Sequence, residues 1–119
     1  MPVRLLASLL AALVFAGPVC AQYPTRTIKL VPNSPPGTGP DVLARILAVR
    51  LAETLGQPVV VESHPGSNGN IAVEFVARSA ADGHTLLICA DAQLAINPHI
   101  YAGMSVDPNK DLVPVAALA

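Results

Sequence analysis

Residues 33–45, NSPPGTGPDVLAR, join an apolar run to an apolar-periodic run through three prolines and two glycines. Gly37 and Gly39 lack a Cβ, so the backbone can turn sharply and a ligand can approach its N–H groups. A helix that starts near Gly39 and Asp41 exposes unpaired N–H donors and a partial positive charge, which favours a carboxylate or a phosphate. Thr38 adds a hydroxyl donor. The junction therefore predicts anion binding.

Neutral groups would have to meet this anion, because residues 33–41 contain no lysine or arginine. The prolines cannot donate a hydrogen bond and instead shape the loop, and Pro40 suits the first position of a helix. Two alternatives stay open. A rigid strand-to-helix turn without a ligand would use the same residues. A dinucleotide-binding turn would need G-x-G-x-x-G, and Val42 stands where the third glycine belongs.

A second group of candidate residues follows the last complete strand that we predict. Asp91 could face the same cleft as the first loop, and so could Gln93, although a solvated loop position is the more typical one for these residues. The chain shows no carboxylate pair, Cys/His pair or nucleophile elbow, and its histidines share no metal-ligand spacing. The sequence therefore predicts no catalytic residue, no metal site and no cofactor.

The elements that must position these residues alternate between strand and helix. Patterns rich in β-formers predict strands at 27–31, 58–63 and 84–90. Apolar residues at helical spacing predict one helix that is capped by Gly39 and ends at Gly56, and a second over 71–77. This alternation predicts an α/β fold, a parallel sheet with flanking helices. Ligands of such sheets bind outside the carboxyl ends of the strands.

Other expectations concern single elements and side chains. The valine-rich strand at 58–63 is expected to be buried on both faces. Residues 91–101 should be irregular or weakly helical with a break before Pro98, and residues 111–119 should begin another strand. His84 is expected to be exposed or at a strand edge, and Cys89 to be a small buried hydrophobic residue.

Residues 1–21 are predicted to be an export signal. They have a basic start and an apolar stretch that is too short to span a membrane. Small residues precede the predicted cleavage point after Ala21. Uncleaved anchoring is one alternative, and lipidation of Cys20 is another. Cleavage would leave residues 22–119 with Cys89 as the only cysteine, so an internal disulfide is excluded.

Composition excludes a nucleic-acid partner, because the net charge is −1, basic residues form no cluster and aromatic residues make up only 3%. The sequence stops inside an apolar run without a cap or turn, so we expect an incomplete domain.

Several stretches together resemble one family, the periplasmic solute receptors of tripartite tricarboxylate transporters, also called the Bug family. The resemblance spans residues 23–119 and is carried by YPTRTIKLV, PPGTGPDVLAR, LGQPVVVESHPGSNGNIAVEFVA, ADGHTLL and INPHIYAGMSVDPNKDLVPVA. It implies an exported protein in which two α/β domains close on a small organic acid, the type II periplasmic binding-protein fold. Residues 22–119 would then be the N-terminal portion of the first lobe.

The resemblance also implies where the ligand binds. Family members hold a ligand carboxylate between glycine-containing loops through main-chain donors and bridging water. On this sequence the ligand-binding residues would be Gly37, Thr38, Gly39, Pro40 and Asp41, with Ala90, Asp91, Ala92 and Gln93 in a second loop. Asp41 itself would act mainly as a helix cap. Asp91 stands where the family has a small neutral residue, which points to an amine-bearing or neutral solute.

The function implied is a non-catalytic periplasmic receptor that captures a small carboxylated metabolite for membrane transporter subunits, and we expect it to be a monomer. An α/β enzyme fragment that binds phosphate is one alternative, and a truncated receptor without function is another.

Overall fold

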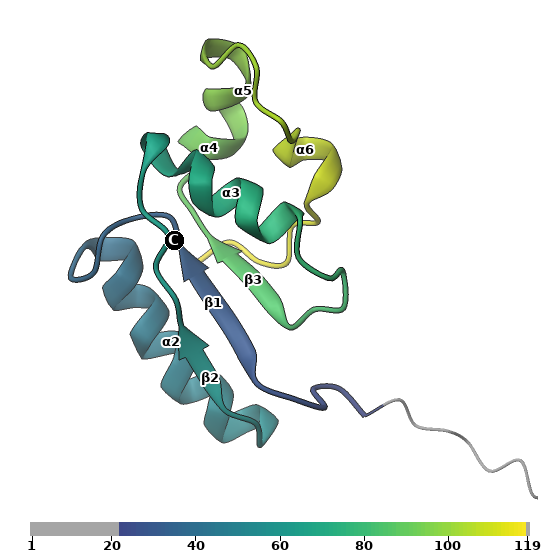
Figure 1. Ribbon diagram of the computed structural model, residues 1–119. Coiled ribbons are helices and arrows are strands. Elements are labelled where there is room, and N and C mark those ends of the chain that lie inside the picture. Colours follow the sequence, from purple (N-terminus) through teal and green to yellow (C-terminus); the bar gives the residue numbers. More distant parts are fainter. Residues whose placement is uncertain (1–21, 119) are drawn as a thin grey trace, which may run out of the picture.

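The computed structural model describes residues 22–118, which form a three-stranded parallel sheet with helices on both faces (Figure 1). The strands are β1 (Ile28–Pro32), β2 (Val59–Val61) and β3 (Thr85–Ile88), and β1 lies between the other two. The helices are α2 (Gly39–Leu55), η1 (Ser67–Gly69), α3 (Asn70–Ala77), α4 (Ala92–Ala95), α5 (Asn97–Ile100) and α6 (Pro108–Asp111). The predicted parallel α/β fold is therefore confirmed. The export signal and Cys20 lie outside the described residues.

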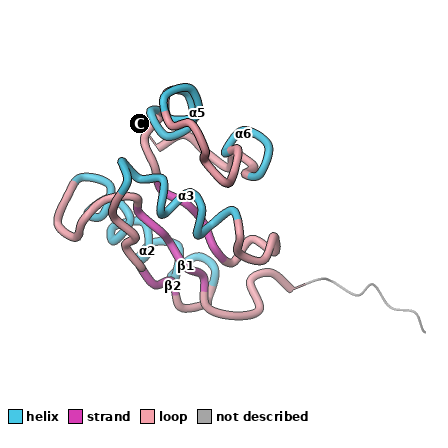
Figure 2. The backbone as a smooth tube through the Cα atoms, turned by 45° about the horizontal axis from the view of Figure 1, so that its top comes forward, coloured by secondary structure: helices cyan, strands magenta, loops and turns pink. Residues whose placement is uncertain are grey.

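Alternation along the strands sends apolar side chains to two separate cores. The core between the sheet and α2 consists of Ile28, Leu30, Ala44, Ala48 and Ile88. The core between the sheet and α3 consists of Val31, Ala72 and Val76. Figure 2 shows the strands between α2 and α3, with α5 and α6 on the α3 side. The two small alanines of α2 let that helix approach the sheet closely, while Val42 and Ile46 on the same helix stay exposed.

The prediction that β2 is buried on both faces was wrong. Val59 and Val61 pack against the core under α2, but Val60 is 43% exposed. The physical reason is that β2 is an edge strand, and α3 packs on β1 and β3. The valine run of β2 is therefore buried on one face of the sheet only, the face that packs against α2.

The ends of α2 follow from its flanking residues. Thr38, in extended conformation, is the N-cap in place of the expected Gly39, and Pro40 lies in the first turn, where its missing N–H has no intrahelical partner to lose. Gly56 ends the helix in the left-handed region at φ 67°, and its N–H donates to the Ala52 carbonyl at 3.0 Å.

One expectation about the later part of the chain is confirmed and another needs correction. Residues 91–101 form two short helices with a break at Ile96, before Pro98, which sits in the first turn of α5. Residues 112–118 form no strand, because no neighbouring strand within residues 22–118 supplies a hydrogen-bonded ladder for them. Leu112 nevertheless packs on the core under α3.

His84 is buried, at 6% exposed, rather than exposed or at a strand edge. Its Nε2 accepts the Thr25 N–H at 3.3 Å, and its ring meets Tyr23 edge-to-face at 5.1 Å between centroids. The Tyr23 hydroxyl donates to the Gly83 carbonyl at 2.6 Å. These contacts cover the histidine with the segment that leads into β1.

Within residues 22–118, no helix has both the length and the apolar character needed to cross a bilayer.

Candidate functional site

The carboxyl ends of the three strands are tied together by backbone hydrogen bonds. The Asn33 N–H, just after β1, donates to Ile88 at the end of β3 at 3.2 Å. The His64 N–H, in the loop after β2, donates to Pro32 at the end of β1 at 3.1 Å. Three loops therefore start from one edge, which is where parallel α/β proteins bind ligands.

A buried carboxylate organises the first of these loops. Asp41 is 1% exposed, and its Oδ2 accepts the Gly37 N–H at 2.9 Å while its Oδ1 accepts the Ser63 hydroxyl at 2.8 Å. Arg45, one turn further along α2, donates Nε to Oδ2 at 2.9 Å and Nη2 to Oδ1 at 3.1 Å. The carboxylate thus joins the loop after β1, the helix and the loop after β2, and a negative charge in the first turn suits the helix dipole.

The surroundings of Asp41 lower the pKa of its carboxyl group from 3.8 to about 2. The largest cause is the side-chain hydrogen bond from Arg45, followed by the Gly37 N–H, whereas burial acts in the opposite direction. The same pairing raises the pKa of Arg45. Asp41 and Arg45 therefore form a neutral pair at the start of α2.

Internal hydrogen bonds decide which amides of the first loop can meet a ligand. The Gly37 N–H is taken by Asp41, and the Thr38 N–H donates to the Pro35 carbonyl at 3.3 Å. The Thr38 hydroxyl also donates to Pro35, at 2.7 Å. Within residues 22–118, the N–H groups of Gly39 and Asp41 have no acceptor. Pro40 has no N–H and Asp41 is 1% exposed, so the amide of exposed Gly39 is the donor that the loop offers to a ligand.

The four residues predicted in the second loop lie after β3, but they differ in what they expose. Gln93 is 5% exposed; its Oε1 accepts the Ala90 N–H at 3.1 Å, and its Nε2 donates to the Asn68 carbonyl at 2.9 Å. Asp91 is exposed at the start of α4, and Ala92 is the first residue of that helix. The amide of Gln93 is thus used inside the protein, and Asp91 is the group of this loop that a solute can meet.

Sequence reasoning missed the turn that precedes α3. All four of its residues have positive φ: Gly66 at 123°, Ser67 at 47°, Asn68 at 52° and Gly69 at 87°. Left-handed backbone costs a residue with a Cβ roughly 1–2 kcal/mol, so the contacts around this turn must hold it in place. The signal available in the sequence was the pair of glycines that flank Ser67 and Asn68.

Asn33 is a second position that the sequence did not single out. A Cβ built on Gly69 would lie 2.7 Å from Asn33 Nδ2 and 3.0 Å from Gln93 Cγ. Gly69 is therefore the point at which the loops after β1, β2 and β3 meet. Asn33 brings a half-buried amide group to this meeting point.

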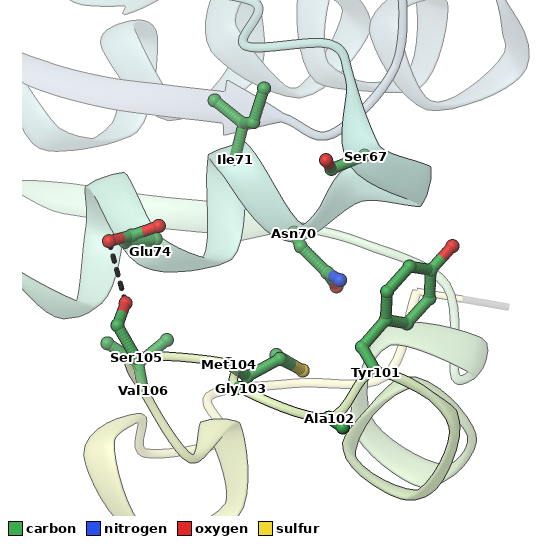
Figure 3. A pocket seen from close by; sticks show the side chains of 10 residues that line it. All are labelled: Ser67, Asn70, Ile71, Glu74, Tyr101, Ala102, Gly103, Met104, Ser105 and Val106. Carbon is green, nitrogen blue, oxygen red and sulfur yellow. Dashed lines mark hydrogen bonds between the residues drawn. The ribbon is translucent and has the colours of Figure 1, made fainter.

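A surface pocket of about 360 Å³ lies apart from this edge, between α3 and residues 101–106 (Figure 3). Asn70, Ile71 and Glu74 line it from α3, and the Ser105 hydroxyl donates to Glu74 at 2.7 Å across one end. None of the predicted binding residues lines it. We place the candidate site at the strand ends instead, because the unpaired amides lie there.

The described residues hold no group of three or more side chains suited to a metal ion. Burial raises the pKa of the half-buried Cys89 thiol, which disfavours the reactive thiolate.

The fold and this edge define a parallel α/β lobe with an anion-compatible helix start. A family model described as "Tripartite tricarboxylate transporter family receptor" matches residues 43–119, and the chain belongs to this family. The match begins inside α2, so the loop at 33–41 precedes it. The family resemblance is thereby confirmed.

Relatives and solved structures agree with this assignment. Protein BugT of Bordetella pertussis is 44% identical over 103 residues, which cover 85% of this chain and 32% of that protein. MatC of Rhodopseudomonas palustris with bound malate has a TM-score of 0.75 at 34% identity, covering 81% of this chain and 33% of that one. A second R. palustris protein, with adipate, has a TM-score of 0.69 at 40% identity, covering 73% and 29%. The chain thus spans about a third of the length of these proteins.

The first prediction concerns Asp41. Because folding lowers its pKa, its charged form contributes stability above about pH 5, and that contribution is lost as the pH falls from 3.8 toward 2. We expect Asp41→Asn to lower the melting temperature at neutral pH, and the gap to the unchanged protein to narrow below pH 4, in thermal melts over a pH series. Asp91→Asn, which removes an exposed carboxylate, is the control. A gap that stays constant down to pH 2 would contradict this account of Asp41.

A second prediction concerns Gly69. Its φ of 87° is one that a residue with a Cβ rarely adopts, and a methyl group there would force the Asn33 side chain, 2.7 Å away, to shift, so Gly69→Ala should lower the free energy of unfolding by about 1–3 kcal/mol. Gly39→Ala is the matched control, because nothing lies within 4 Å of a Cβ there, and it should change stability by less than about 0.5 kcal/mol. Urea unfolding measures both. Equal stability of the two variants would argue against a tight junction at Gly69.

Proposed function

We infer that this chain forms the ligand-binding edge of a periplasmic receptor that captures a small carboxylated metabolite. The observation that carries this function is the unpaired and exposed Gly39 amide at the start of α2, on the carboxyl edge of the sheet. A ligand carboxylate placed there accepts the Gly39 N–H and lies at the N-terminal end of a helix of 17 residues, where the helix dipole favours negative charge.

In this proposal, backbone dipoles rather than ionic side chains stabilise the negative charge of the ligand carboxylate. Arg45 is paired with Asp41, so the pair adds no net charge near the ligand. Each hydrogen bond from a neutral donor to a carboxylate contributes about 1.5–3 kcal/mol. One such bond, with the helix dipole and further contacts from elsewhere in the cleft, accounts for an affinity in the micromolar range after the costs of association.

The class of ligand is a small organic acid. Two structural relatives are described with adipate and with malate, and both of these ligands are dicarboxylates. Exposed Asp91, on the loop after β3, disfavours a second carboxylate close to it and favours an amino or hydroxyl group at that end of the ligand. We therefore expect a carboxylate with an amine or a neutral polar tail to bind better than a simple dicarboxylate.

The receptor acts by binding alone and hands its ligand to membrane transporter subunits, as the family description implies. Closure of a second lobe over the edge would complete the site. Export by residues 1–21 would place the protein in the periplasm, the compartment named for the relative BugD.

The test is a thermal-shift screen, followed by calorimetric titration, with malate, adipate, aspartate, glutamate, inorganic phosphate and a sugar phosphate. We expect selective thermal stabilisation by at least one carboxylate. Aspartate, which carries an ammonium group, should raise the melting temperature more than malate. A response to phosphates alone would replace the receptor by a phosphate-binding enzyme. No response from any carboxylate would remove the proposed function.

Gly39→Pro tests the proposed contact directly, because proline removes the N–H of a first-turn residue without disturbing the helix. The extended conformation of Thr38, φ −84° and ψ 169°, is one that a residue before proline adopts readily. We expect this variant to melt like the unchanged protein and to bind the best carboxylate about ten- to a hundred-fold more weakly in calorimetry. Gly39→Ala keeps the N–H and serves as the control. Equal affinities of the two variants would exclude Gly39 as a ligand donor.

A further inference from the structure

The turn at residues 66–69 is held by a network of side-chain amides that comes from a distant part of the sequence. Asn97, the first residue of α5, donates Nδ2 to the Asn68 carbonyl at 3.1 Å and to Asn70 Oδ1 at 2.6 Å. Its own Oδ1 accepts Asn68 Nδ2 at 3.0 Å. One side chain thus uses both ends of its amide on the turn.

The network is closed to solvent at its centre. Asn97 is 0% exposed, and no buried side-chain nitrogen or oxygen within residues 22–118 lacks a partner. The Asn68 carbonyl accepts a second amide, from Gln93 Nε2 at 2.9 Å. Removal of the Asn68 or Asn70 side chain therefore leaves part of the buried Asn97 amide unpaired, and removal of Asn97 takes three hydrogen bonds from the turn.

The consequence reaches the ligand edge through packing. The network fixes Asn68, Asn68 fixes the conformation of Gly69, and Gly69 lies against Asn33, the residue that starts the loop toward α2. Figure 3 shows the Asn70 side chain on the pocket side of this turn. Asn97 itself is buried and cannot touch a ligand, so any effect it has on binding must pass through these residues.

We propose that Asn97 is a positioning residue for ligand binding, which holds the left-handed turn at 66–69 against the loop that leads from β1 to α2. This inference rests on the proposed function, since it concerns the same edge. In this proposal, the buried side-chain amide of Asn97 on α5 sets the distance between the turn at 66–69 and the loop after β1.

The test compares Asn97→Ala with Asn109→Ala in the full chain. Asn109 donates its side-chain amide to the Leu94 carbonyl at 3.0 Å but lies outside the network and is exposed, so it is a matched control. We expect Asn97→Ala to weaken binding of the best carboxylate from the screen about ten-fold and Asn109→Ala to leave it within about two-fold. In hydrogen–deuterium exchange, the amides of residues 67–70 should exchange faster in Asn97→Ala, while those of β1 should stay protected.

A lower melting temperature with unchanged affinity and unchanged exchange at 67–70 would overturn the proposal, because Asn97 would then stabilise the fold only. If Asn97→Ala does not fold, Asn70→Ala, which removes one hydrogen bond of the network at a half-buried position, decides by the same two readouts. Exchange at the turn needs no ligand. Failure of every carboxylate to bind therefore refutes the proposed function, whereas unchanged exchange refutes the positioning role.

Discussion

A single buried carboxylate, that of Asp41, joins three segments at the edge where the ligand is proposed to bind. It accepts the Gly37 N–H and the Ser63 hydroxyl and pairs with Arg45, so the loop after β1, the start of α2 and the loop after β2 share one acceptor. The same contacts decide which backbone N–H can meet a ligand. Because the Gly37 N–H donates to Asp41 and Asp41 is itself buried, the exposed Gly39 amide is left for a ligand.

A second junction lies at the Asn68 carbonyl, where amides from Gln93 and Asn97 converge. The two junctions share no residue, and Gly69, next to Asn68, packs against Asn33 at the start of the loop that leads to Asp41. The polar groups within each junction are paired with one another. The start of α2 therefore presents a backbone dipole rather than an ionic side chain to a ligand.

Local signals account for what the sequence predicted well. The strand before residue 33 was predicted from a short run of β-forming residues. The helix that ends at Gly56 was predicted from apolar residues at helical spacing and from a glycine that takes the left-handed cap. The capping role expected of Asp41 involves a contact with Gly37, only four residues away. The glycines at 66 and 69 show that the chain turns there, but the hydrogen bond to Asn97, 29 residues from Asn68, lies beyond any local pattern. The internal hydrogen bonds of Gln93 and the exposed face of Val60 likewise depend on how distant segments pack.

The central claim is that the Gly39 amide at the start of α2 binds a carboxylate. Titration of the ¹⁵N-labelled protein with malate and with aspartate, followed by two-dimensional NMR of the backbone amides, tests it most directly. The account predicts that the Gly39 N–H signal moves downfield with the same saturation curve as calorimetric binding, while the Gly37 signal moves less. Saturable binding that leaves Gly39 unshifted would contradict it.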